Sequence, residues 1–324
     1  MPLLIDTDPG IDDALALLLA LLSPGVTVEA ITAVAGNVGV DQAVANVFRI
    51  LHVARPASAP RTARGASSPL TRPLLTAAHV HGDDGLGNLA RFVEADGRPR
   101  YPDLAHDLET HDGADLILEM ADRHGKDLII VALGPLTNVA RAAERDSRRL
   151  RQAGRVVVMG GADGVPGNVT PAAEFNFYVD PEAAAAVLDA GLPVELVPLD
   201  VTRQVVLRQS ELAARLRRCE SPVARFVADF TLHGFAFGGG QGEAGFALHD
   251  PLAVGVALDP SIVGFESFHV EVECEGRATR GMSVADRRPL PSHHKRRPNC
   301  RVAISVDAPR FLQLFLDRLC PESA

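Results

Sequence analysis

Short apolar runs alternate with longer amphipathic segments along most of the chain. Apolar runs rich in Val and Ile predict buried strands, and apolar residues spaced three or four apart predict helices. The predicted strands are the run at Leu4 and Ile5 and residues 26–34, 127–133, 155–159 and 194–199. Helices are predicted between them, for example at 40–54 and 111–124. This alternation predicts an α/β fold with an open, mostly parallel, Rossmann-like sheet flanked by helices.

The last third of the chain has a different pattern. Residues 267–273, 280–285 and 300–307 predict a smaller antiparallel strand section, and residues 308–319 predict a closing helix. Three segments predict irregular structure: a connection at 55–75, a mobile loop at 78–87 and a flexible Gly-rich segment at 235–245. We find no internal repeat and no linker, so we predict a single domain over residues 1–324.

Composition excludes several classes of partner. The chain has 324 residues, 47% of them hydrophobic, and a net charge of −9, which gives no electrostatic case for nucleic acid or an anionic membrane. No apolar run reaches the roughly 18 residues of a membrane span, and the N-terminus has no signal-peptide pattern. Four scattered cysteines without CxxC spacing indicate reduced thiols and a cytoplasmic protein. The basic loop within 286–301 is interpreted as a solvated hairpin.

The first strand leads into a dense acidic cluster. Asp6, Asp8, Asp12 and Asp13 lie within eight residues, and Pro9-Gly10 forms a turn between the two pairs. Helix capping explains one or two acids at the start of a helix, but not four. Clustered carboxylates become tolerable when a divalent cation with oxygen ligands neutralises them. The cluster therefore predicts a hard-cation site at the carboxyl end of a strand.

The run DTDPGIDDALALLLA resembles the N-terminal signature of the nucleoside hydrolases of the inosine-uridine-preferring type. Further segments that match this family occur in its order: AGN, HVHG, LGPLTN, VVMGG, GNVTPAAEFN, VDPEAA and HDP. The resemblance implies a calcium-dependent ribonucleoside N-glycosidase, with Ca²⁺ as cofactor and a small ribonucleoside as substrate. It also implies a role in nucleoside catabolism and salvage, and a homodimer or homotetramer.

The resemblance assigns roles to individual positions. It implies that calcium is held by Asp8, Asp13, Asp250 and the backbone carbonyl of Leu133. The implied substrate-binding residues are Asp12, Asn37, His81, Met159, Asn168, Glu174, Phe175, Asn176 and His249. Among them, His81 belongs to a lid and His249 faces the base.

The implied reaction has two catalytic residues. Asp8 removes the proton from a calcium-bound water, whose pKa the metal lowers. His249 protonates or hydrogen-bonds the leaving base, because histidine titrates near neutrality. The family forms no covalent glycosyl intermediate, so the resemblance implies inversion at the anomeric carbon.

Several of these positions also have plain structural explanations. Asn37 suits a turn, and either His249 or Asp250 suits a helix cap. Thr137 and Asn138, which follow the predicted strand at 127–133, equally suit caps. We expect Asp83 and Asp84 in the loop at 78–87 to be solvated.

Two alternative functions share the acidic motif. Asp6-x-Asp8 after a first strand is similar to a haloacid-dehalogenase-like phosphatase, but neither Lys126 nor Lys295 is placed to supply that family's lysine. A calcium-dependent ribose-binding protein without catalysis would share the site, but the intact Asp8 argues against it. The preferred base stays open, because the segment before HDP has Phe235 and Phe237 in place of the family's tyrosines. The absence of Trp disfavours purine specificity.

Overall fold

The central element of the structure is a mostly parallel sheet. The computed structural model describes residues 1–324 except 106, 220, 241–244, 290–295 and 321–324. Among the described residues, eight strands form this sheet in the order β3-β2-β1-β4-β5-β6-β12-β9. The strands are β1 (Pro2–Thr7), β2 (Thr27–Ala33), β3 (Arg61–Arg64), β4 (Ile129–Ala132), β5 (Arg155–Met159), β6 (Val194–Val197), β9 (Val263–Phe268) and β12 (Cys300–Val306). Only the β12–β9 pairing in this sheet is antiparallel, so the predicted fold class is confirmed.

Two small antiparallel sheets lie outside the central one. β7 (Val206–Arg208) pairs with β8 (Gly245–Ala247), and β10 (Val270–Val272) pairs with β11 (Ser283–Ala285). The second pair provides the antiparallel section that the sequence predicts near the C-terminus.

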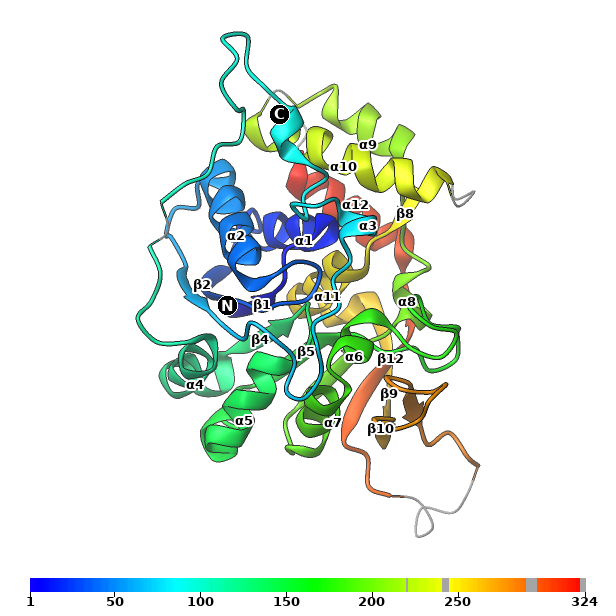
Figure 1. The fold of residues 1–324 in the computed structure, drawn as a ribbon. Helices are drawn as coiled ribbons and strands as arrows, with labels where there is room; N and C mark the ends of the chain where they lie inside the picture. The colour runs from blue at the N-terminus through cyan, green and yellow to red at the C-terminus, as the bar shows by residue number, and fades with distance from the viewer. Residues whose placement is uncertain (106, 220, 241–244, 290–295, 321–324) are drawn as a thin grey trace.

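Helices connect the strands and cover both faces of the sheet (Figure 1). The α-helices are α1 (Ile11–Leu21), α2 (Val40–Ala54), α3 (Ala78–His81), α4 (Gly113–His124), α5 (Thr137–Leu150), α6 (Phe175–Val179), α7 (Pro181–Asp189), α8 (Leu199–Thr202), α9 (Gln209–Leu216), α10 (Pro222–Gly240), α11 (His249–Leu258) and α12 (Ala308–Leu319). Short 3-10 turns occur at η1 (Leu89–Arg91), η2 (Gly125–Asp127) and η3 (Pro260–Ile262). Asp180 caps α7 by accepting from the Ala183 amide, as the DP sequence predicts.

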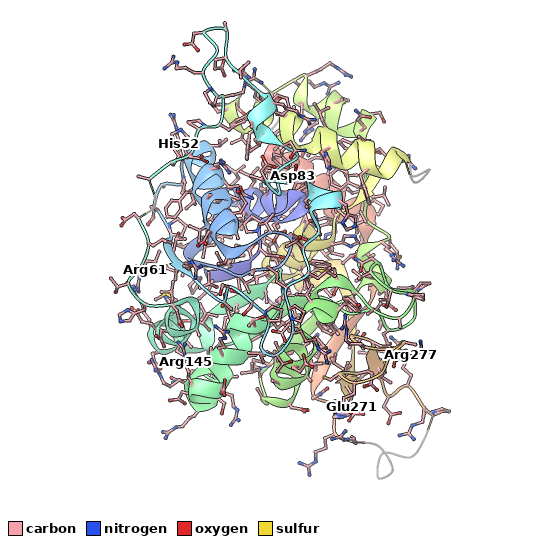
Figure 2. All side chains as sticks on the ribbon, viewed as in Figure 1. His52, Arg61, Asp83, Arg145, Glu271 and Arg277 are labelled. Carbon is pink, nitrogen blue, oxygen red and sulfur yellow. The ribbon has the colours of Figure 1, made fainter. Side chains whose placement is uncertain are left out.

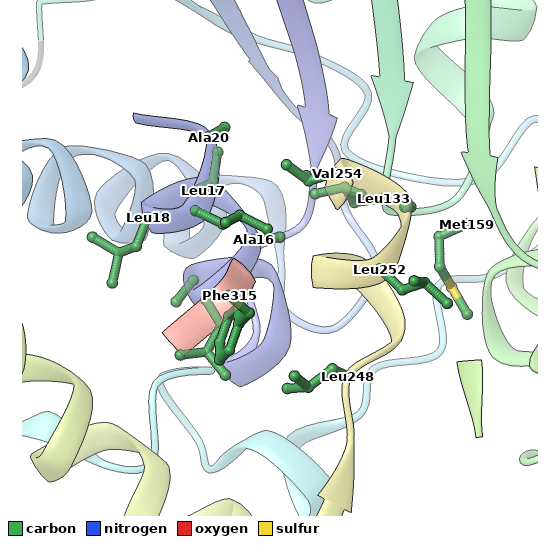
Figure 3. Close-up of a cluster of buried hydrophobic side chains, with 14 of the residues drawn as sticks. Ala16, Leu17, Leu18, Ala20, Leu133, Met159, Leu248, Leu252, Val254 and Phe315 are labelled. Carbon is green, nitrogen blue, oxygen red and sulfur yellow. The ribbon is translucent and has the colours of Figure 1, made fainter. Parts of the chain in front are cut away.

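The side chains of alternate strand residues pack into two apolar layers, one on each face of the sheet. Leu3 and Ile5 of β1 pack with α1, α11 and α12, whereas Leu4 belongs to the layer formed with α4, α5 and α7. Figure 3 shows the first layer, where Leu133 and Met159 lie near Leu252 of α11. Charged side chains such as Arg61 and Arg145 lie outside these layers (Figure 2). Burial on both faces explains why the central strands are apolar without alternation.

Three predicted irregular segments contain regular structure. Residues 55–75 include β3, an edge strand whose RTAR sequence lacks an apolar signal because only one side pairs and half its residues face solvent. Residues 235–245 were predicted to be flexible, but α10 extends to Gly240 and β8 begins at Gly245; residues 241–244 lie outside the described residues. A Cβ at Gly238 would lie 2.7 Å from the Gly245 carbonyl oxygen, so close packing favours glycine in this helix despite its low propensity. The loop at 78–87 begins with the short helix α3.

The predicted C-terminal strands are partly wrong in their bounds and pairing. Residues 267–273 are divided between β9 and β10 rather than forming one strand. β12 is not purely antiparallel: it joins β6 in parallel register and β9 in antiparallel register. Apolar periodicity predicts a strand but carries no information about the direction of its neighbour, so the pairing of β12 could not be predicted from the sequence pattern.

Candidate active site

The carboxyl ends of neighbouring parallel strands bring the predicted site residues together. Asp8 directly follows β1, Leu133 follows β4, and Met159 ends β5. Asn37 lies in the connection from β2 to α2. Because β2, β1, β4 and β5 are adjacent and parallel, these ends share one edge of the sheet, the usual ligand edge of such folds.

Three carboxylates converge at this edge. One oxygen each from Asp12, Asp13 and Asp250 lies within 4.8 Å of the others. Asp12 and Asp13 occupy the first turn of α1, and Asp250 occupies the first turn of α11. Two packed helices therefore bring together acids about 240 positions apart in sequence. This group differs from the predicted ligand set, because it contains Asp12 and lacks Asp8.

Asp13 is held by a network of donors. Its carboxylate accepts hydrogen bonds from the Thr7 hydroxyl (2.6 Å), the Gly10 amide (2.9 Å) and Asn37 Nδ2 (3.0 Å). Asn37 thus contacts the acid cluster with its side chain and is more than a turn residue. The sequence analysis missed Thr7, although its position inside the DTDPG motif was a usable signal.

Asp8 is fully buried, with one oxygen bonded and the other unpaired. Its Oδ2 accepts from the Asn37 amide at 2.6 Å. Its Oδ1 has no hydrogen-bond partner among the described residues. Glycines flank the carboxylate: a Cβ at Gly36 would lie 2.0 Å from Oδ2, and one at Gly134 would lie 2.4 Å from Oδ1. A buried, unpaired carboxylate oxygen is costly, and a cation at this point would satisfy it.

The acids raise one another's pKa. Burial, followed by the charges of neighbouring acids, raises the pKa of Asp8 and of Asp250 well above the usual range. Burial and the Asp13 charge raise the pKa of Asp12 to about 7. Such a concentration of buried carboxylates fits a site built for a divalent cation, because the cation would offset the repulsion.

The residues predicted to bind the ribose brace the loop after β5. Glu174 caps α6: its carboxylate accepts from the amides of Asn176, Phe177 and Gly161, and burial raises its pKa to about 7. Asn168 Oδ1 accepts from the Phe175 amide at 2.9 Å. Asn168 is exposed and Phe175 is half-buried, whereas Glu174 and Asn176 are buried.

Asn176 links this loop to the end of β4. Its Nδ2 donates to the Leu133 carbonyl at 2.6 Å and to the Met159 carbonyl at 3.2 Å. The Leu133 side chain points into the core (Figure 3), so only its carbonyl is available to the site. A carbonyl oxygen has two lone pairs, so the bond from Asn176 leaves one for a cation.

Two neutral histidines border the cluster. His249 Nδ1 lies 2.7 Å from the Thr202 hydroxyl, and His81 Nδ1 accepts from the Ile11 amide at 3.0 Å. Burial lowers the pKa of each imidazole to about 4. Thr202 was missed from sequence, because it lies 47 positions before its partner and no short motif connects the two.

His233 on α10 is a further histidine that the sequence analysis missed. Its Nε2 is buried without a hydrogen-bond partner among the described residues. On the same helix face, four positions later, Phe237 makes an edge contact with His79, with ring centroids 6.3 Å apart. The helix that the sequence predicts to be flexible at this point therefore faces the predicted lid with aromatic and imidazole side chains.

Several polar residues prove to be structural. Asn138 donates to Asp6 Oδ1 and accepts from the Ala66 amide, and Thr137 donates to Asp180, so neither acts as a cap. His249 and Asp250 likewise lie inside α11 rather than capping it.

Asp84 and Asp6 also differ from their predicted environments. Asp84 accepts from three backbone amides of its loop and is not simply solvated, whereas Asp83 is exposed. Asp6 is fully buried and bonded to Thr32 and Asn138, and burial raises its pKa to about 7. A phosphatase nucleophile must reach its substrate, so this environment argues against the phosphatase alternative.

Comparison with known proteins matches this geometry to a family. Residues 3–313 match the family model described as inosine-uridine preferring nucleoside hydrolase. The chain belongs to this family. It is 37% identical over 321 residues to a pyrimidine-specific ribonucleoside hydrolase RihA of Salmonella schwarzengrund, covering 98% of both chains. It is 38% identical over 322 residues to the RihA of Escherichia coli O9:H4, again covering 98% of both.

Solved nucleoside hydrolases share the whole fold. A purine-preferring ribonucleoside hydrolase from Gardnerella vaginalis superposes with a TM-score of 0.88 at 34% identity, covering 98% of each chain. A plant nucleoside hydrolase, PpNRh1, also superposes with a TM-score of 0.88, at 32% identity and 99% coverage of each chain. The nucleoside hydrolase described here is therefore a ribonucleoside hydrolase that acts on N-glycosyl bonds, and the phosphatase and non-catalytic alternatives are wrong.

Within the described part of the chain, no helix is both long enough and apolar enough to cross a bilayer. The four cysteines, Cys219, Cys274, Cys300 and Cys320, are free thiols.

Proposed function

We propose that the enzyme hydrolyses ribonucleosides to ribose and free base at a calcium site formed by Asp8, Asp13, Asp250 and the Leu133 carbonyl. The observation that carries this proposal is the buried Oδ1 of Asp8, which has no partner among the described residues and lies beside the acids of α1 and α11. All of these donors are oxygens, as Ca²⁺ prefers. When bound, calcium supplies a Lewis acid that orients the attacking water, lowers its pKa and accepts ribose hydroxyls.

In this proposal, Asp8 is the general base. Its carboxylate takes a proton from the water that attacks the anomeric carbon. The Asn37 amide fixes one oxygen of Asp8 at 2.6 Å, so the other oxygen, which has two lone pairs, would both contact the calcium and accept the proton. Gly36 and Gly134 leave the space that the Asp8 carboxylate occupies, because a Cβ at either position would meet one of its oxygens.

The sugar is oriented from two sides. Asp12 and Asn37 lie beside the acid cluster, and Asn168, Glu174, Phe175 and Asn176 belong to the loop after β5, where Met159 supplies an apolar contact. The loop is braced by its own backbone bonds, so its side chains are held in place before substrate arrives. We propose that these residues bind the ribose hydroxyls.

His249 and His81 face the leaving base in this proposal. We propose that Thr202 donates to His249 Nδ1, 2.7 Å away, which would place the hydrogen of the neutral ring on Nε2, where it can be donated to the base. Burial lowers the pKa of His249 to about 4, which favours hydrogen-bond donation over transfer of a proton from an imidazolium. His81 would act from the lid segment between α3 and η1.

Base preference is proposed from the relatives. The RihA proteins are pyrimidine-specific by name and match 98% of the chain, and the chain has no Trp for purine stacking. We therefore propose a preference for pyrimidine ribonucleosides. A steady-state panel of uridine, cytidine, inosine, adenosine and guanosine tests it, and a higher kcat/KM for any purine nucleoside would contradict it.

The cellular setting is part of the same proposal. Free cysteines are consistent with a reducing cytoplasm, where the enzyme would act in nucleoside catabolism and salvage. We propose one domain over residues 1–324, supported by a sheet that receives strands from both ends of the chain. A homodimer or homotetramer is proposed from the family resemblance, and light scattering on the purified protein tests it.

The metal proposal has a direct test. Exhaustive chelation should abolish uridine hydrolysis, and added calcium should restore it. Magnesium should restore less activity, since it requires near-ideal octahedral geometry and dehydrates reluctantly. Full activity in a preparation shown by elemental analysis to be metal-free would overturn the proposal.

A further inference from the structure

A cavity of about 580 Å³ lies between the C-terminal end of α2 and the N-terminal end of α10. This volume is within the usual range of small-molecule sites. Asn37, which contacts the acid cluster, precedes α2, and a helix of 15 residues is about 22 Å long. The cavity is therefore roughly one helix length from the active site and separate from it. Figure 2 shows His52, one of its lining residues, near this end of α2.

The lining is strongly basic in an acidic protein. The arginines that line the cavity are Arg49, Arg55, Arg100 and Arg225, and His52 adds an imidazole ring. Within the described chain, which omits residue 220, no carboxylate belongs to the lining. The net charge of the whole chain is −9, so this concentration of guanidinium groups is local. Such a lining favours an anion.

Two of the arginines are already neutralised. Arg49 forms an ion pair with Asp103, and Arg100 forms ion pairs with Glu94 and Asp229. These carboxylates are not among the lining residues. Arg49 and Arg100 are therefore anchored elements of the wall.

The other two arginines are held less firmly by the protein. The Arg55 guanidinium has no hydrogen bond or ion pair to a described residue. Arg225 has a side-chain exposure of 54% and forms a longer ion pair with Glu94 at 3.4 Å, which leaves other N–H groups of its guanidinium for a ligand. Guanidinium groups present several N–H donors in a planar fork, which suits the multiple oxygens of a phosphate.

The remaining wall is apolar and aromatic. Val53, Leu104 and Leu216 line it together with Tyr101. The Tyr101 ring packs on Phe226 with centroids 5.0 Å apart, and its hydroxyl donates to Asp229 at 2.8 Å. The ring is thus fixed, with its polar end satisfied. An inorganic anion alone would leave this wall without a partner.

We propose that this cavity is a second ligand site, which binds a small organic phosphate: a phosphate ester whose apolar or aromatic group lies against Tyr101 and its neighbours. Arg55 and Arg225 bind the phosphate group. The site is independent of the calcium chemistry at the active site, so this proposal can be tested separately from the proposed function.

Isothermal titration of the calcium-loaded enzyme with phenyl phosphate tests the site. We expect saturable binding with one site per chain, weaker binding of inorganic phosphate and no binding of benzyl alcohol. The double variant Arg55→Asn and Arg225→Gln should weaken binding of phenyl phosphate by at least about tenfold, since each charged hydrogen bond carries roughly this factor. Asn suits position 55 because the backbone there is left-handed, with φ 46°.

The matched control is the double variant Arg148→Gln and Arg277→Gln. Both arginines are exposed, and neither forms an ion pair with another described residue, so the same charge is lost elsewhere. It should bind phenyl phosphate like the wild type, and both double variants should hydrolyse uridine at the wild-type rate.

Four results would overturn the proposal. The first is no saturable binding of phenyl phosphate up to about 10 mM, a concentration at which a site with a millimolar Kd would be nearly saturated. The second and third are equal affinity in the two double variants, and equal affinity for inorganic phosphate and phenyl phosphate. The fourth is competition between phenyl phosphate and uridine, which would locate binding in the active site. A changed oligomeric state in the Arg55/Arg225 variant, measured by light scattering, would instead show that a second copy of the chain covers the cavity.

Discussion

At the scale of single residues, Asp8 combines two features that usually exclude each other. It is fully buried, yet one carboxylate oxygen has no partner among the described residues. Leaving such an atom unpaired costs about 1–3 kcal/mol or more for a charged group. A protein tolerates this cost where strain or charge is part of function, so Asp8 is the first residue to test.

Replacing Asp8 with Asn should keep the fold and lower kcat for uridine by at least ~10²-fold, the usual lower scale for losing a general base. In chelator, the variant should melt at a higher temperature than the wild type, because it no longer carries a carboxylate that Asp13 and burial disfavour. Asp41→Asn is the control: Asp41 is an exposed acid whose ion pair among the described residues is with Arg64. A kcat within a few-fold of the wild type in a metal-loaded Asp8→Asn enzyme would rule out the role of the base.

His249→Ala should separate leaving-group assistance from water attack. Uridine needs help for its departing base, whereas p-nitrophenyl riboside has a good leaving group, so the loss should be large for the first and small for the second. Thr202→Val provides a milder version, because it removes the hydroxyl that lies 2.7 Å from His249 Nδ1. Equal losses on both substrates would assign His249 to sugar positioning or to the metal site.

The site residues that belong to short sequence motifs could be predicted from the sequence. The DPGIDD and HDP segments locate Asp12, Asp13 and Asp250, which the structure brings within 4.8 Å. Thr202 and His233 were not predictable, because each takes its place through tertiary packing and neither belongs to a short motif. The paired state of Asp84 depends on loop geometry, which polarity alone does not reveal.

At the scale of elements, the loops after β1, β2 and β4 share a dependence on glycine. The carboxylate of Asp8 lies between Gly36 of the β2 loop and Gly134 of the β4 loop, with no space for a Cβ at either position. Gly39, in the same loop as Gly36, faces open space. Gly36 and Gly39 therefore provide a test position and a matched control within one loop.

Gly36→Ala should lower kcat/KM by about 10²-fold, the scale expected when a catalytic group is displaced by about 1 Å. The added Cβ would lie 2.0 Å from Asp8 Oδ2 and 2.7 Å from Pro135 Cδ, so the carboxylate or the loop must move. Gly39→Ala should leave kcat/KM unchanged, because nothing lies within 4 Å of its Cβ. Similar kinetics in the two variants would mean that the position of Asp8 does not limit the reaction.

Helices and strands were predictable where their burial requires a recognisable apolar pattern in the sequence. The strands near 127–133 and 155–159 are apolar because both faces of the sheet are covered, and the structure contains β4 and β5 there. The edge strand β3 has no such pattern, and the Gly-rich end of α10 contradicts helix propensity. In both cases tertiary contacts decide the conformation, so local sequence gives a wrong answer.

At the scale of the whole molecule, the parallel sheet converts distant sequence positions into one site. Asp13 and Asp250 are brought together because α1 and α11 pack side by side over the same face. Assembling these acids concentrates negative charge, which opposes folding unless protons or a cation are bound. Stability and metal binding should therefore be coupled.

Removing calcium should lower the melting temperature, and the loss should grow between pH 5 and pH 8. Burial, followed by the charges of neighbouring acids, raises the pKa of Asp8, Asp12 and Asp250. A folded-state pKa above the unfolded value means that the metal-free native state binds more protons, so its stability is present at low pH and is lost as pH rises through the folded pKa. Calcium replaces those protons, and at a hundredfold excess over Kd it stabilises by about 2.7 kcal/mol. Differential scanning calorimetry with and without chelator at several pH values measures the effect. A calcium-induced shift that stays constant across this range, or is larger at pH 5, would show that the buried carboxylates are not the groups that bind the metal.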